Sequence, residues 1–187
     1  MGIQAVLVMV ALTAALAGCA RSARIMSPFA DRYDGEGKQR PEGRHSGVDV
    51  WGRPGEPVLA AADGWVVEVG DIPHVEGRAT CGRFVVLQHD ARFIVANLSS
   101  TATTKYCHLA ERTVQDGTRV RRGDVIGLIG RTGWRRLIAH ETGYEHVHWE
   151  LALRGSLSDP LEITVGCFDP SQRYPSDRLV LTYPVRC

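Results

Sequence analysis

Two histidines stand one residue apart in the stretch YEHVHWELAL, residues 144–153. Side chains alternate between the two faces of a β-strand, so His146 and His148 share one polar face with Glu150. Their Cα atoms would lie about 7 Å apart, so one ring could bind a metal ion and the other could reach its water. The pair alone is weak evidence, because histidines are common on exposed faces. The opposite, apolar face is predicted to enter the core and comprises Val147, Trp149, Leu151 and Leu153.

A second group of metal-ligating residue types lies upstream in HSGVD, where His45 and Asp49 are four residues apart. An imidazole nitrogen and a carboxylate oxygen are both good Zn²⁺ ligands. Together with His148 they would supply three protein ligands and leave the fourth position to water. Such open coordination is typical of a catalytic zinc site, whereas structural sites are closed. The alternative is an ordinary turn in which Asp49 caps a neighbouring segment.

The segment KYCHLA, residues 105–110, holds a further histidine. In a regular strand Tyr106 and His108 would share a face, and Cys107 would point the other way. His108 is therefore expected to face the site while Cys107 faces a disulfide partner. The alternatives are a solvated surface histidine at His108, or a metal role for Cys107, which strand alternation argues against.

These segments belong to a set of motifs that resembles one protein family. HSGVD, AAADGWV, YCHLA, VRRGDVIGLIGRTG and HVHWEL are similar to motifs of the lysostaphin-type (LytM-like) zinc endopeptidases of bacterial cell walls. The resemblance runs over about residues 27–162, with three site motifs in the family's order and at roughly its spacing. The combination is far more specific than any one of these motifs.

The resemblance implies a zinc-dependent endopeptidase that hydrolyses peptide cross-links of bacterial peptidoglycan, with the peptide stems as its partners. It also implies a role for each matching residue. Carried over to this chain, the zinc ligands are His45, Asp49 and His148, and the catalytic pair is His108 and His146.

The same family also suggests an alternative, non-enzymatic function. Some relatives that have lost ligands are non-enzymatic regulators, which activate wall amidases as protein partners. The intact ligand set argues against this reading here. The link WRRLIAHETGYE, residues 134–145, is longer than in the family, which affects the expected substrate preference and not the expected activity.

Short strands are expected to position these residues. From Val58 onward, runs rich in Val, Ile and Leu end at Gly, Asp or Asn, and the chain holds 20 Gly and 9 Pro. This pattern predicts a mainly β fold with few short helices, one of them at 134–141. We expect a single antiparallel-sheet domain over about residues 27–165, sandwich-like and of the lysostaphin type.

Two sequence segments also resemble the half-units of lipoyl and biotinyl carrier domains: GEPVLAAADGWVVEVG and GTRVRRGDVIGLIG. A carrier function would need an exposed lysine at a hairpin tip to hold the prosthetic group. The tips read Asp63-Gly64 and Gly123-Asp124. The similarity is therefore attributed to a related β architecture and not to shared chemistry.

The N-terminus is predicted to be an export signal. Residues 3–17 carry no charge, and LAGC follows at 16–19, which resembles a bacterial lipobox. Residues 1–18 would be the signal peptide, Cys19 the lipidated residue and 20–26 a tether. The protein would then lie in the periplasm, held by a lipid anchor. The resemblance to lipoproteins implies that this anchor is in the outer membrane, because the residue after the cysteine is Ala20 and not Asp. The alternative is an uncleaved membrane span.

Four cysteines remain after Cys19, an even number that in an exported protein suggests two disulfides with three possible pairings. Cys81 begins one strand-like run and Cys107 ends the next, so a cross-strand bridge is reasonable. Cys167 and Cys187 bracket a C-terminal extension, residues 166–187, which a bridge would pin down.

Length and charge set broad limits. With 187 residues the chain can form one domain with a sizeable core. Its 22 basic and 21 acidic residues leave a formal net charge of +1. This balance gives no reason to expect a nucleic acid partner.

Overall fold

The computed structural model describes residues 23–33, 37, 39–40, 43–75, 79–89, 101–133 and 145–187. The predicted signal peptide, Cys19 and the short helix predicted at 134–141 lie outside these residues. No helix among the described residues is long and apolar enough to span a membrane.

The described residues form eleven β-strands and one 3₁₀ helix. The elements are β1 (Ile25–Ser27), β2 (Val48–Trp51), β3 (Pro57–Leu59), β4 (Gly64–Ile72), β5 (Gly82–His89), β6 (Ala102–Cys107), β7 (Leu109–Arg112), β8 (Arg119–Val120), β9 (Val125–Ile129), β10 (His146–Leu153), β11 (Ser156–Ser158) and η1 (Pro160–Ile163). The strand β1 begins inside the tether predicted at 20–26.

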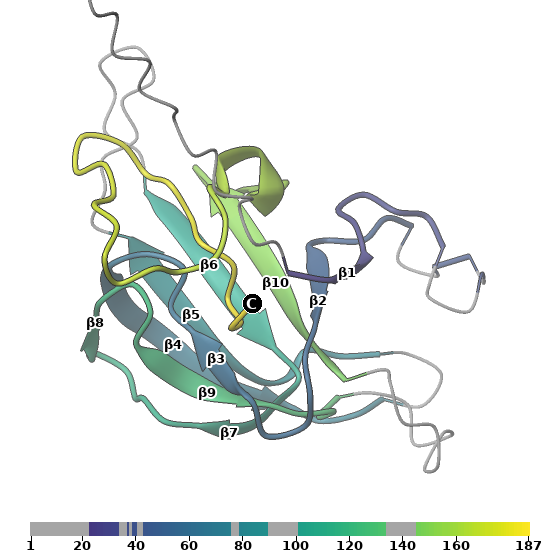
Figure 1. Cartoon of the computed structure of the whole chain (residues 1–187). Coiled ribbons are helices and arrows are strands. Elements are labelled where there is room, and N and C mark those ends of the chain that lie inside the picture. The colour runs from purple at the N-terminus through teal and green to yellow at the C-terminus, as the bar shows by residue number, and fades with distance from the viewer. Residues whose placement is uncertain are drawn as a thin grey trace, which may run out of the picture.

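The strands build two antiparallel sheets. The larger has the order β1-β2-β10-β6-β5-β4-β8, with β11 paired to β10, and the smaller has the order β3-β9-β7. The smaller sheet lies against one face of the larger one (Figure 1). Apolar residues of both sheets form a single buried cluster between them. The predicted class, a mainly β fold with antiparallel sheets and few short helices, is confirmed.

The central strand β10 follows the predicted alternation. Val147 and Trp149 are 0% exposed and Leu151 is 1% exposed, all within the core cluster. Burying a large apolar side chain stabilises the fold by roughly 1.5–3 kcal/mol. These three residues therefore anchor β10 in one register. His148 is thereby held on the opposite face of the sheet.

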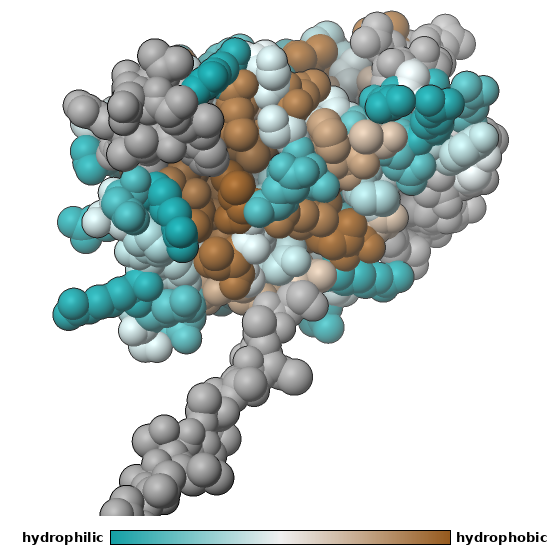
Figure 2. All heavy atoms as spheres, turned by 90° about the horizontal axis from the view of Figure 1, so that it is seen from above, coloured by the Kyte–Doolittle hydropathy of each residue, from teal (hydrophilic) through white to brown (hydrophobic). Residues whose placement is uncertain are grey.

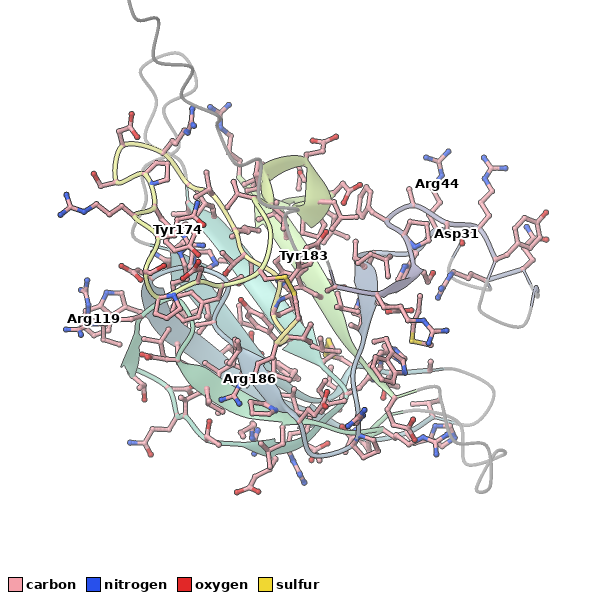
Figure 3. All side chains as sticks on the ribbon, viewed as in Figure 1. Asp31, Arg44, Arg119, Tyr174, Tyr183 and Arg186 are labelled. Carbon is pink, nitrogen blue, oxygen red and sulfur yellow. A yellow bond between two sulfur atoms is a disulfide. The ribbon has the colours of Figure 1, made fainter. Side chains whose placement is uncertain are left out.

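The C-terminal extension also packs into this core. It is the yellow segment of Figure 1, and Figure 3 shows Tyr174 and Tyr183 on it. Its backbone bonds to the loop after β3, with Thr182 N–H donating to Ala61 O at 2.9 Å. Figure 2 views the molecule from above and shows apolar side chains in the middle of that face, among hydrophilic ones. The buried apolar side chains of the extension are Leu179, Val180, Leu181 and Val185.

Arg122 and a disulfide hold the extension in place. The Arg122 guanidinium donates to Val180 O at 2.8 Å and lies 4.2 Å from the ring centroid of Tyr174. Cys167 and Cys187 form a disulfide, one of the two bridges considered from the sequence. The extension is thus part of the core and not an appendage.

Removing this bridge is expected to lower stability. Cys167 and Cys187 are 20 residues apart, and opening a loop of this length costs about 3 kcal/mol in the chain-entropy description. The Cys167→Ala/Cys187→Ala protein should therefore unfold at lower denaturant concentration, followed by tryptophan fluorescence. An unchanged midpoint would contradict the prediction.

Candidate active site

The sheet pairs two of the predicted ligands directly. Asp49 on β2 lies opposite His148 on β10 in the antiparallel register. Such cross-strand neighbours have Cβ atoms about 5 Å apart and share a face. His45 lies before β2 and is held by backbone hydrogen bonds, with His45 N–H donating to Asp31 O at 2.8 Å. Figure 3 shows Asp31 and Arg44 on the loop that projects beside β1 and β2.

The three side chains converge on one point. The Nε2 atom of His45 and the Nδ1 atom of His148 are 2.9 Å apart. The Oδ1 atom of Asp49 lies 2.9 Å from His148 Nδ1 and 3.1 Å from His45 Nε2. All three residues are at most 9% exposed. Among the described residues, this is the group of His, Cys, Asp and Glu side chains able to hold a metal ion.

The arrangement fits zinc. In tetrahedral coordination with bonds of about 2.0–2.1 Å, neighbouring ligand atoms are about 3.3 Å apart. The separations between His45, Asp49 and His148 are close to this value, and the donors are the nitrogen and oxygen atoms that zinc prefers. With three protein ligands, the fourth corner stays available to water or substrate.

The other ring nitrogen of each of the two predicted ligand histidines is also engaged. The Nδ1 atom of His45 lies 2.9 Å from Pro28 O, and the Nε2 atom of His148 lies 3.2 Å from Glu150 Oε1. Ser46 Oγ donates to the same Glu150 oxygen at 2.6 Å. Such contacts orient the rings of metal ligands. The sequence reasoning missed Pro28 and Ser46, and it gave Glu150 a place on this face but no contact.

Charge is concentrated at this point. Burial alone would raise the pKa of Asp49, but the charge of His146 and the hydrogen bond of His148 hold that pKa well below its usual range. Burial would lower the pKa of His148, but its hydrogen bonds to Asp49 and Glu150 raise that pKa to about 9. The raised pKa of His148 favours its protonated ring in the metal-free protein. A metal ion must displace this proton, so acid weakens binding.

His108 reaches the site by a route that strand alternation does not predict. Tyr106 is 0% exposed and opposes Trp149 on the core face, whereas Cys107 opposes His148. The prediction that Tyr106 and His108 share a face is therefore wrong. His108 lies between β6 and β7 with φ 65°, a left-handed conformation that breaks the alternation. Cys107 is disulfide-bonded to Cys81 and is not available as a metal ligand.

The two remaining histidines lie beside the three-residue group. The ring centroids of His108 and His146 are 5.0 Å apart, and those of His108 and His148 are 5.9 Å apart. His146 Nε2 lies 3.6 Å from Asp49 Oδ1. Burial, together with the charges of His146 and His148, lowers the pKa of His108 well below its usual value. The lowered pKa of His108 favours the neutral imidazole, the form that a general base requires.

The sequence model of Peptidase family M23 matches residues 43–160, which run from before β2 to the first residue of η1. The match contains the five predicted site residues, His45, Asp49, His108, His146 and His148. The chain belongs to peptidase family M23. The resemblance to the lysostaphin-type peptidases is thereby confirmed.

Relatives of this M23 domain include the peptidoglycan DD-endopeptidase ShyA of Vibrio cholerae. It is 36% identical over 111 residues, which are 59% of this chain and 21% of ShyA. The crystal structure of a zinc-containing peptidase from Vibrio cholerae matches with a TM-score of 0.53 at 27% identity, covering 75% of this chain and 36% of that one. This chain spans between 21% and 32% of the length of the curated relatives that it matches.

The catalytic domain of lysostaphin from Staphylococcus simulans shares the M23 fold. It matches with a TM-score of 0.55 at 23% identity, covering 75% of this chain and 90% of that domain. The likeness concerns the fold alone.

Gly47 has a steric role in this M23 site. A Cβ atom at Gly47 would collide with the carbonyl oxygen of Trp149 on β10. The glycine of HSGVD therefore lets the segment from His45 to Ser46 lie directly against the strand that carries His148. Only the structure reveals this need, because the colliding carbonyl is remote in sequence.

Gly47→Ala is expected to push His45 away from His148 and weaken metal binding. Changes that disturb the support of metal ligands typically cost about 10–100-fold in affinity. Competition with a chromogenic zinc chelator measures this loss. Gly55→Ala is a control for general loss of stability, because its Cβ meets nothing within 4 Å but strains the backbone at φ 79° away from the site. Equal zinc affinity in Gly47→Ala and the wild type would contradict the prediction.

Proposed function

We propose that this protein is a zinc-dependent endopeptidase that hydrolyses peptide cross-links of bacterial peptidoglycan. The observation that carries the proposal is the convergence of His45, Asp49 and His148 within hydrogen-bond distance, with His108 and His146 beside them. Membership of family M23 and similarity to a protein named as a peptidoglycan DD-endopeptidase support the substrate class.

His45, Asp49 and His148 would hold the metal ion in this proposal. When bound, zinc polarises the scissile carbonyl and lowers the pKa of a water molecule to near 7. The remaining steps belong to the other two histidines. The Nδ1 atom of His108 lies 2.9 Å from Thr132 O, and in that contact it donates. The Nε2 atom of His108 is then an acceptor, which takes a proton from the attacking water and passes it to the leaving amine.

His146 would stabilise the oxyanion that forms when water attacks the peptide carbonyl. A protonated ring nitrogen can donate to such an oxygen, and an interaction of this type is worth about 3–4 kcal/mol in other hydrolases. The position of His146 beside Asp49, with 3.6 Å between Nε2 and Oδ1, supports the assignment.

We further propose that the protein acts in the cell envelope, anchored through Cys19 to the outer membrane and facing the periplasm. The LAGC sequence supports the anchor. Two or more acyl chains hold a protein stably to a bilayer, whereas one does not. In such an envelope the substrate would be the cross-link between D-alanine and diaminopimelate, with a glycine bridge as the alternative.

Digestion of purified sacculi tests the function. Zinc-loaded protein should convert cross-linked muropeptide dimers into monomers, identified by mass, and a chelator should stop the conversion. Zinc-loaded protein that leaves every dimer intact across a range of pH and salt would contradict the proposal. A purified protein that binds no zinc would instead favour the non-enzymatic regulator of wall amidases.

A further inference from the structure

The backbone at His108 is held by a neighbouring strand. His108 has φ 65°, and its N–H donates to Cys81 O at 2.8 Å. The preceding residue, Cys107, is disulfide-bonded to Cys81. A left-handed conformation costs a non-glycine residue roughly 1–2 kcal/mol, so it persists only where its surroundings enforce it. Cys81 supplies both a covalent bond and a hydrogen bond for this purpose.

Thr132 holds the ring of the same histidine. Its carbonyl oxygen lies 2.9 Å from His108 Nδ1. Its hydroxyl donates to Leu109 O at 2.9 Å and accepts from Arg83 N–H at 2.8 Å. Thr132 is thus bound to the residue that follows His108 and to the strand that follows Cys81.

The Thr132 turn packs against the Cys81 strand without a gap. A Cβ atom at Gly82 would collide with the carbonyl carbon of Thr132, and one at Gly133 would collide with the backbone of Gly82. Thr80 N–H also donates to Gly133 O at 2.9 Å. Two segments about fifty residues apart in sequence therefore enclose His108 as one unit.

We propose that the Cys81–Cys107 disulfide and Thr132 form a clamp that positions His108 as the general base. The disulfide fixes the backbone from which the ring projects. The Thr132 carbonyl keeps the proton on Nδ1 and leaves Nε2 as the acceptor. The inference rests on the proposed function for its catalytic consequence, but the orientation of the ring can be measured separately.

The other disulfide provides a matched control. Cys81 and Cys107 are 26 residues apart in sequence, and Cys167 and Cys187 are 20 apart. Loops of such similar length contribute similarly to stability in the chain-entropy description. Only the first bridge adjoins His108. A purely structural role therefore predicts similar effects of the two deletions on turnover, whereas the clamp predicts different ones.

The experiment compares full-length Cys81→Ala/Cys107→Ala with Cys167→Ala/Cys187→Ala, both well below their melting temperatures. A base displaced by about 1 Å costs roughly 100-fold in rate. The first variant should keep its zinc, show little change of KM and lose between about 10- and 100-fold in kcat. The second should lose stability and keep kcat. Equal kcat values in the two variants would overturn the clamp.

Thr132 offers an independent test that does not need the disulfide. Thr132→Ser keeps the hydroxyl and its two hydrogen bonds, so kcat should stay close to that of the wild type. Thr132→Val keeps the shape and loses both bonds, so the turn is released and kcat should fall as in the Cys81 variant. A Thr132→Val protein with wild-type kcat would overturn this part of the clamp.

Histidine ¹⁵N NMR separates failure of the clamp from failure of the proposed function. His108 should show the Nδ1–H tautomer in the wild type and a mixture of tautomers in Thr132→Val. If the wild type cuts no cross-link but shows this difference, the clamp holds and the endopeptidase proposal fails. If His108 carries its proton on Nε2 in the wild type, the clamp is wrong whatever the activity.

Discussion

Replacing His45 with alanine is expected to empty the metal site and abolish hydrolysis. His45 supplies one of three convergent donor atoms, 2.9 Å from His148 Nδ1 and 3.1 Å from Asp49 Oδ1. With two ligands left, a zinc ion loses both affinity and the tetrahedral arrangement. Loss of a supporting group costs about 10–100-fold in affinity, so loss of a ligand should exceed roughly 100-fold. Zinc per molecule, measured by atomic emission after dialysis, should fall from one to near zero.

His89→Ala is the matched control for this result. His89 is a buried histidine, 5% exposed, whose ring bonds to Asp63 O and Thr104 Oγ1 and takes no part in the metal group. Its replacement should lower stability and leave the zinc content unchanged. A His45→Ala protein that kept its zinc while His89→Ala lost it would show that the ligand assignment is wrong.

Replacing His108 with alanine is expected to give the opposite combination, with full zinc content and almost no turnover. His108 lies beside the metal group, with its ring centroid 5.9 Å from that of His148, and it is not one of the three convergent ligands. A general base contributes typically about 10²–10⁴-fold to rate. The fall should therefore be of this size in kcat, with little change of KM.

The two outcomes can be told apart on the same samples. Zinc content and kcat are measured in parallel for His45→Ala and His108→Ala against the wild type. Added imidazole should restore part of the turnover of His108→Ala, because a free base can enter the space left by the ring. An empty metal site in His108→Ala would mean that this histidine supports metal binding, and the division into ligands and catalytic pair would then be wrong.

Strand periodicity and motif chemistry predicted much of the site. The alternation in residues 146–153 predicted which face of β10 enters the core, and the burial of Val147, Trp149 and Leu151 confirms it. The residue types in HSGVD and HVHWEL predicted a zinc site, and the structure brings His45, Asp49 and His148 together. Their roles as ligands remain a proposal.

Other features of the site were not accessible from the sequence. Strand alternation placed Tyr106 and His108 on one face. In the structure Tyr106 is in the core, and His108 itself has a left-handed backbone conformation that directs its side chain to the other face. Nothing in KYCHLA indicates this break, because the residues that enforce it are remote. Cys81 is 26 residues before Cys107, and Thr132 is 24 residues after His108.

The sequence by itself determined the mainly β class, the family and the residue types able to bind zinc. These depend on the two-residue period of a strand and on the chemistry of each side chain, and both are local properties. Only the tertiary structure determined the orientation of the His108 side chain, the steric need for glycine at position 47 and the packing of the C-terminal extension into the core. Each of these depends on contact between segments that come together only when the two sheets pack, and such contacts leave no periodic pattern along the chain.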